Sequence, residues 1–104
     1  MAYESGSFET ALAAAAGEDH VLVAELRLAF LESASRHLDL LRRARCDGNW
    51  QMAALRLQGI AASFHDDNLG DLARDAATGA PGDPAAIRRI GQHLDAVGGQ
   101  AAPY

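Results

Sequence analysis

The amino-acid sequence predicts an all-α fold, an antiparallel up-down-up-down four-helix bundle with a short extra helix at the N-terminus. Its 104 residues are 49% hydrophobic, which suits a single domain, 1–104, with one core. Leucine and alanine recur at the three- and four-residue steps of amphipathic helices. β-Branched residues are few, three Val, three Ile and two Thr, so the composition favours helices over a sheet.

The first two helices differ in length. Ser7 is expected to cap a short helix over 8–16, which Gly17 ends. A long helix is then predicted over roughly 18–46, because acidic residues at its start and basic residues at its end suit the helix dipole: Glu18, Asp19, Arg42, Arg43 and Arg45. Its predicted inner face contains Leu22, Val23, Leu26, Ala29, Phe30, Leu41 and Ala44.

A tight break is expected at 47–49, where Gly48 can adopt a positive φ. The next helix is predicted over about 49–64, and so short a connection makes it antiparallel to the long helix. The tetrapeptide HDDN then supplies a turn and capping carboxylates, so a fourth helix is predicted over about 67–77.

The last helix is predicted to begin where Asp83 precedes Pro84. Its inner face carries apolar residues at helical spacing: Ile87, Ile90, Leu94 and Val97. Residues 98–104 are expected to fray, which leaves a bundle core of about 18–97.

Composition excludes several classes of function. The formal charge is −5, and the chain has nine basic residues, all arginine, so a nucleic-acid partner is not expected. No apolar run reaches the roughly 20 residues of a membrane span, and the start lacks the features of a signal peptide. The single cysteine, Cys46, cannot form an internal disulfide, which fits a reducing compartment. We therefore expect a cytoplasmic protein without a membrane partner.

The predicted 49–64 helix has two apolar sides. At 100° per residue, one side collects the expected core: Trp50, Ala53, Ala54, Leu57, Ile60, Ala61 and Phe64. The opposite side carries small or apolar residues between two polar flanks: Met52, Leu55, Arg56, Gln58, Gly59, Ala62 and Ser63. A glycine inside a helix costs about 1 kcal/mol relative to alanine. The second side is either a docking surface or a solvent face that tolerates a glycine and one leucine.

The segment NWQMAALRLQGIAASFHDDNLGDLARDA, residues 49–76, resembles the core of the histidine phosphotransfer (HPt) domains of multistep two-component phosphorelays. Those domains carry the pattern A-H-x-L-K-G-x-A, a later apolar position, and then L-x-x-L-A-x-x-L. Leu57, Gly59 and Ala61 match the first pattern, Phe64 matches the later position, and LGDLARDA matches the second pattern. The resemblance extends over about 20–97, since AELRLAFLESASRHLDLLRRA is similar to the family's second helix.

Two departures from the HPt pattern bear on function. The phosphoacceptor histidine position holds Leu55, and the supporting lysine position holds Gln58. A leucine side chain has no nucleophilic nitrogen and cannot form a phosphoramidate. The resemblance therefore implies a pseudo-phosphotransfer protein of bacterial-type signalling. It would bind a response-regulator receiver domain or a histidine-kinase domain without carrying phosphate.

Two alternatives stay open. One is active phosphotransfer through a non-standard histidine, of which His65 is the first candidate, although the two aspartates after it would repel a phosphoryl group. Of the other histidines, His20 is expected in solvent, His37 in the core, and His93 beside the inner face of the last helix. The other alternative is a structural homodimer through residues 52–62, although a monomer is expected.

Catalysis by the chain itself is not expected. No Gly-rich phosphate loop, paired histidines or triad spacing appears, so neither an enzyme nor a cofactor is predicted. The acidic HDDN segment reads as a cap and turn rather than as a metal site.

Overall fold

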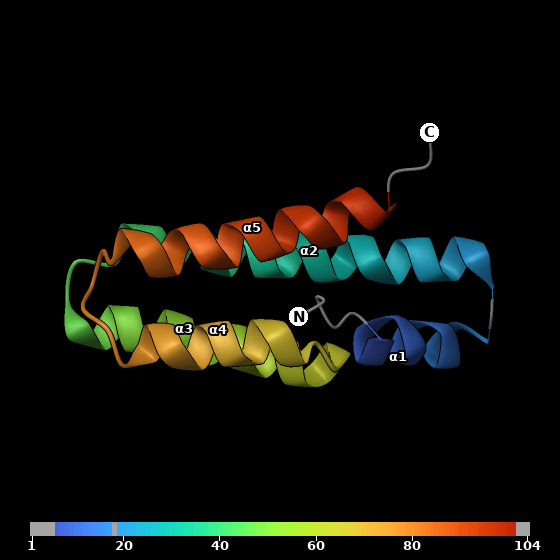
Figure 1. The fold of residues 1–104 in the computed structure, drawn as a ribbon, viewed down its shortest axis with the longest axis horizontal. Helices are drawn as coiled ribbons and strands as arrows, with labels where there is room; N and C mark the ends of the chain where they lie inside the picture. The colour runs from blue at the N-terminus through green and yellow to red at the C-terminus, as the bar shows by residue number, and fades with distance from the viewer. Residues whose placement is uncertain (1–5, 18, 102–104) are drawn as a thin grey trace.

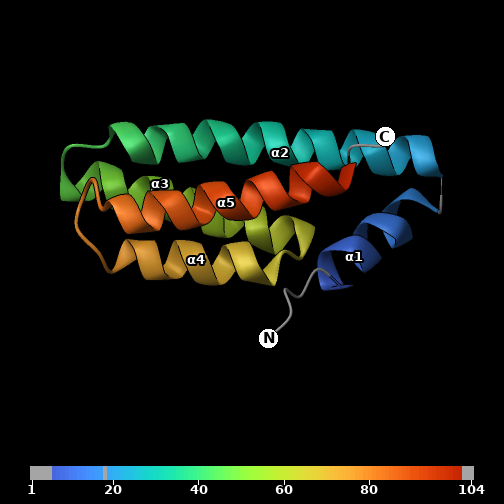
Figure 2. The same ribbon diagram turned by 45° about the horizontal axis from the view of Figure 1, so that its top comes forward.

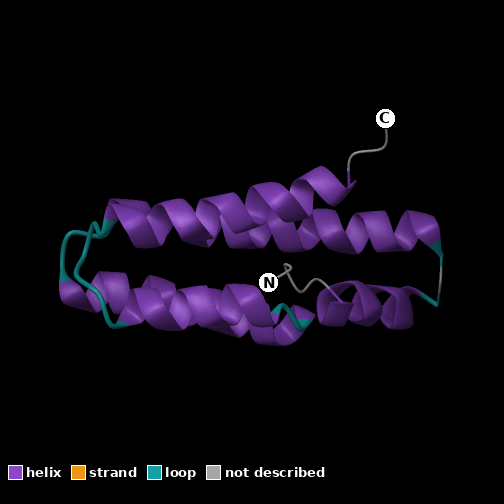
Figure 3. Cartoon of the chain, viewed as in Figure 1, coloured by secondary structure: helices purple, strands orange, loops and turns teal. Residues whose placement is uncertain are grey.

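The protein is described here from a computed structural model that covers residues 6–17 and 19–101. Five helices make up nearly all of this part of the chain, and it contains no strand: α1 (Gly6–Ala16), α2 (His20–Arg43), α3 (Asp47–Phe64), α4 (Asp67–Ala77) and α5 (Pro84–Ala101). The all-α class predicted from the sequence is therefore confirmed. Figure 3 shows how short the connecting loops are relative to the helices.

Helices α2 to α5 form the main packed group of the fold. Helix α2 packs against α3 and α5, and α4 also packs against α3 and α5. The colours of Figures 1 and 2 show that the chain reverses direction at each loop, so that sequential helices run antiparallel. Helix α2 is longer than α3 and extends past its end. Helix α1 packs against this extension of α2 and against the end of α3.

The first helix begins earlier than expected. It already includes Gly6 and Ser7, so the prediction that Ser7 caps it is wrong. Gly17, with φ +60°, ends it as predicted, because a glycine adopts the left-handed region without steric cost. The expected role of Glu18 lies outside the described residues.

The ends of α2 also differ from the prediction. Asp19 caps its start, accepting hydrogen bonds from the amides of Val21 and Leu22 at 3.0 and 3.2 Å. The helix ends at Arg43 rather than near 46, so Arg45 lies beyond its last turn. The Arg45 guanidinium instead donates to the carbonyl oxygens of Arg42 and Ala44, both at 3.3 Å, and so binds acceptors at the end of the helix.

The turn between α2 and α3 lies three residues earlier than the sequence predicts. The chain turns through residues 44–46, where Ala44 and Cys46 are both extended, and α3 begins at Asp47. Gly48 is therefore a helical residue and does not have the expected positive φ. Extended backbone at two ordinary residues makes this turn without a glycine.

The fourth helix has the predicted bounds, and Asp66 caps its start by accepting from the Leu69 amide at 3.1 Å. The fifth helix is longer than predicted. It runs to Ala101, so residues 98–101, which were expected to fray, are helical, and residues 102–104 lie outside the described part of the chain. Packing explains the difference: a Cβ at Gly98 would lie 3.7 Å from the Leu31 side chain, so α5 still contacts α2 there.

One apolar core joins all five helices. Aromatic rings hold its α1 end: Phe30 lies 4.8 Å from Phe8 and 5.1 Å from Phe64 between ring centroids. Two residues assigned to the inner face of α2, Leu22 and Ala29, are exposed instead. Because α2 packs against α5 as well as α3, its buried face is centred on Arg27, Phe30, Ala34, Leu38 and Leu41.

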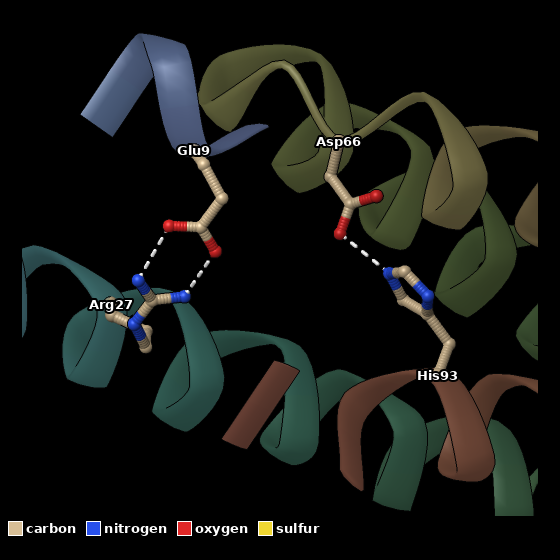
Figure 4. Close-up of polar contacts among 4 residues, drawn as sticks. All are labelled: Glu9, Arg27, Asp66 and His93. Atoms are coloured by element: carbon tan, nitrogen blue, oxygen red, sulfur yellow. Dashed lines mark hydrogen bonds and ion pairs between the residues drawn. The ribbon is translucent and has the colours of Figure 1, made fainter. Parts of the chain in front are cut away.

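A partly buried ion pair joins α1 to α2. Both terminal nitrogens of Arg27 donate to the Glu9 carboxylate, at 2.6 and 2.7 Å, as Figure 4 shows. The Arg27 guanidinium also lies 5.7 Å from the centre of the Phe8 ring. Burial of Arg27 is thus compatible with its charge, because a carboxylate and an aromatic face replace water.

Candidate functional site

The outward face of α3 is set by what the helix buries on its other side. Trp50 and Leu57 are fully buried, as are Ala53, Ala54 and Ala61 to within a few per cent. The indole nitrogen of Trp50 donates to the Ala76 carbonyl oxygen at 2.7 Å, which joins α3 to the end of α4. These contacts determine the rotation of α3 about its axis, and they leave the opposite side uncovered.

This opposite side is the surface predicted from the sequence, and we call it the α3 outer face: Met52, Leu55, Arg56, Gln58, Gly59, Ala62 and Ser63. Leu55 is 62% exposed and Met52 is 54% exposed, the two largest apolar side chains on it. Six of the seven residues are exposed, and Gln58 is half-buried toward α4. The structure thus brings the predicted residues together on one uncovered side of one helix.

Gly59 makes the middle of this face flat. A Cβ built at Gly59 would meet no heavy atom within 4 Å, so nothing inside the fold requires a glycine there. Gly70 on α4 is different, because a Cβ there would lie 3.7 Å from Ala61. Gly59 carries the helix-propensity cost of a glycine and gains no packing against the described residues.

A groove of about 610 Å³ lies beside the outer face, between α2 and the first half of α3. We call it the arginine groove, and its lining contains no carboxylate: Leu40, Arg43, Ala44, Asn49, Met52, Ala53 and Arg56. Arg43 shares its charge with Asp39 at 2.6 Å, whereas no carboxylate of the described residues lies within 4 Å of Arg56. The Arg56 side chain instead lies over Met52, with its nitrogen 3.6 Å from the sulfur.

Sequence reasoning missed one residue of this surface, Leu40. Leu40 is 44% exposed and comes from α2, fifteen residues before Leu55. The sequence gives only a weak signal that Leu40 is exposed, since Leu40 stands next to the buried Leu41 in the long helix. Only the packing of α2 on α3 places it next to Met52.

A second groove, of about 300 Å³, lies on the other side of the outer face, between the second half of α3 and α4. We call it the acidic groove, and it is lined by Gln58, Ala61, Ala62, Asp66, Asp67, Gly70, Asp71 and Arg74. Asp71 is paired with Arg74 at 2.8 Å. Asp66 is buried against His93 at 2.7 Å, whereas Asp67 is exposed and has no arginine or histidine nitrogen within 4 Å among the described residues.

None of the four histidines belongs to the α3 outer face. His93, expected only beside the inner face of α5, is buried, and its Nε2 lies 2.7 Å from Oδ2 of Asp66 (Figure 4). With Asp66 as a carboxylate, the imidazole donates this bond. His37 was expected in the core but is half-buried, and its Nδ1 donates to the Ser33 carbonyl oxygen at 2.7 Å. His20 is exposed at the start of α2, as predicted.

His65 ends α3 in the left-handed conformation, with φ 59° and ψ 36°. It lines a third groove of about 570 Å³, whose other residues come from α1, α2 and the end of α3: Ala11, Leu12, Ala14, Ala15, Leu26, Ser63 and Phe64. None of these neighbours is basic. His65 therefore occupies a different surface from Leu55, and this groove offers no cation that could neutralise a phosphoryl group.

Comparison with protein-family models, curated proteins and solved structures finds no match for this chain. None of the described helices is long and apolar enough to cross a membrane. Among the described residues, no three His, Cys, Asp or Glu side chains come close enough to hold a metal ion.

Proposed function

We propose that the protein is a pseudo-phosphotransfer protein that binds a receiver domain of a response regulator, or a histidine-kinase domain, without carrying phosphate. The α3 outer face is the proposed contact surface. The observation that carries the proposal is that Leu55, which stands at the phosphoacceptor position of the HPt pattern, is 62% exposed at the centre of that face.

The arrangement of the helices supports the HPt-like part of the proposal. Helices α2, α3, α4 and α5 pack in a closed cycle of neighbours, with antiparallel sequential helices. We take this as an up-down-up-down four-helix bundle with α1 as the extra N-terminal helix. The residues at the aligned HPt positions divide as a bundle requires, since the matching Leu57 and Ala61 are buried while Gly59 and the departing Leu55 are exposed.

The chemistry of the face supports binding without transfer. Leu55 offers no nitrogen to a phosphoryl group, and Gln58 can donate a hydrogen bond but supplies no positive charge. An exposed leucine and methionine beside a bare glycine form an apolar, flat centre that suits protein contact. The arginine groove next to it suits the carboxylates around a receiver's phosphorylation pocket.

The test is a binding screen of the purified protein against receiver domains and kinase dimerisation domains of its host. We expect at least one receiver domain to bind, and Leu55→Arg to abolish that binding with unchanged helical circular dichroism. Leu28→Arg is the matched control, because Leu28 is also exposed, at 57%, but lies on α2. Equal binding by the Leu55→Arg variant would refute the proposed surface.

The same screen separates the two alternatives. Incubation with a phosphorylated receiver should leave no acid-labile label on the protein; label that disappears in His65→Gln would instead favour active transfer. Light scattering at several concentrations should report a monomer. A dimer that Leu55→Arg dissociates would favour self-association through the outer face.

A further inference from the structure

The α3 outer face lies between two grooves of opposite charge. The arginine groove borders its first half, through Met52 and Arg56, and the acidic groove borders its second half, through Gln58 and Ala62. At 100° per residue, Arg56 and Gln58 project to opposite sides of Leu55. The two grooves are therefore diagonally opposed, displaced both across α3 and along it.

Each groove keeps one charge that the described residues do not pair. Arg43 and Asp71 each form an exposed ion pair on their own helix, with Asp39 at 2.6 Å and with Arg74 at 2.8 Å. Arg56 and Asp67 have no partner of opposite charge within 4 Å among the described residues. A uniform basic rim would suit any acidic partner, but a face with one free cation and one free carboxylate at opposite corners favours a partner with both signs.

Between the two charged positions, Arg56 and Asp67, the surface of α3 carries mostly small side chains. Gly59 presents no side chain, Ala62 presents only a methyl group, and Leu55 provides the apolar contact. Small residues at one point of a helix let a second helix approach its backbone closely. The diagonal from the arginine groove to the acidic groove crosses α3 at this low point.

We infer that the α3 outer face binds an amphipathic helix of a partner protein, laid across Gly59, with carboxylates at one end and basic side chains at the other. The acidic end lies over Arg56, and the basic end lies over Asp67. Carboxylates at the N-terminal end and cations at the C-terminal end suit a helix dipole, so the partner helix points from the arginine groove to the acidic groove. The location of this surface rests on the proposed function.

The test uses three stapled helical peptides of about 16 residues, roughly 24 Å long, with one shared apolar stripe. One carries glutamates at its N-terminal end and lysines at its C-terminal end, the second carries glutamates at both ends, and the third lysines at both ends. Each is titrated into isotope-labelled protein and followed by NMR. We expect the bipolar peptide to bind about tenfold more tightly than either uniform peptide at low salt, with the largest shifts at Leu55 and Gly59.

Two variants test the sign at each corner. Arg56→Gln and Asp67→Asn should each weaken binding of the bipolar peptide by about threefold. Arg36→Gln and Glu32→Gln are the controls, because they change the net charge equally from exposed positions on α2 outside both grooves. Thermal melting of each variant checks that the fold is intact.

Several results would overturn the inference. They are tighter or equal binding of a uniform peptide, strengthened binding in Asp67→Asn, shifts centred away from Gly59, or no binding at about 1 mM peptide. Failure of the proposed function is a different result, since it is read from the receiver screen. A receiver domain that binds through Leu55 but binds more tightly to Asp67→Asn would retain the proposed function and reject the bipolar helix.

Discussion

The indole nitrogen of Trp50 donates a 2.7 Å hydrogen bond to the carbonyl oxygen of Ala76, between a fully buried ring in the first turn of α3 and the last turn of α4. This bond and the packing of the ring determine which side of α3 faces the core. Leu55 lies on the other side for that reason. The candidate surface is thus a consequence of how Trp50 is held.

Trp50→Phe should destabilise the fold by about 2 to 4 kcal/mol, because the smaller ring leaves a cavity and removes the indole donor. The Ala76 oxygen still accepts from the Gly79 amide at 3.0 Å, so the lost bond is the smaller part. Urea denaturation followed by circular dichroism measures the change. Met52→Ala, at an exposed position of the same helix, should change stability by less than about 0.5 kcal/mol, and a similar loss in both variants would contradict this role of Trp50.

Asp66 and His93 should be energetically coupled. Asp66→Asn keeps an oxygen that can cap α4 but puts a neutral amide opposite His93. A double-mutant cycle of Asp66→Asn and His93→Gln therefore isolates the interaction free energy of the buried pair. We expect a coupling free energy of at least about 1 kcal/mol from urea denaturation of the four proteins. Strictly additive effects would show that the 2.7 Å contact contributes nothing to stability.

Glu9→Gln should loosen α1 from α2, since it removes the carboxylate that pairs with the buried Arg27 at 2.6 Å. The expected loss is about 1 to 2 kcal/mol, at the low end for a buried pair because the Glu9 side chain is 35% exposed. Hydrogen exchange should show faster exchange in α1 with little change in α4. Glu25→Gln, on the exposed side of α2, is the control, and equal acceleration there would argue against the ion pair.

Gly59→Ala should stabilise the protein by about 1 kcal/mol, because the added methyl group meets no atom within 4 Å and alanine favours the helix. The same methyl group should weaken binding of a partner that approaches the backbone at this point. Gly99→Ala, an equally open glycine on α5, should leave binding unchanged. Tighter partner binding by Gly59→Ala would mean that the bare helix surface has no part in docking.

Leu55→His combined with Gln58→Lys should convert the protein into a phosphoacceptor if the α3 outer face binds a receiver. The exposed position accommodates an imidazole, and the lysine brings a cation one turn away. Acid-labile, alkali-stable label from a phosphorylated receiver is the expected signal. Leu55→His with Gln58 unchanged shows how much the cation adds, and binding of the double variant without any label would weigh against the HPt-like alignment.

Local rules predicted much of the helix order. Asp19 and Asp66 cap the starts of α2 and α4 through their side chains, and Gly17 ends α1 through its positive φ. Each of these effects acts within a few residues along the chain. The rules failed where no local signal decides the boundary. Gly48 is helical because two extended residues before it already make the turn, and α5 continues past Gly98 because that glycine packs on α2.

The amino-acid sequence by itself determined that the chain is helical and that α3 has a second apolar side, because helical periodicity depends only on the order of residues along the chain. The tertiary structure decided what surrounds that side. Leu40 and Arg43 reach it from α2 and Asp67 from α4, and His93 meets Asp66 across 27 residues. Such neighbours follow from how whole helices pack, and no spacing within one helix records which residues of another will lie against it.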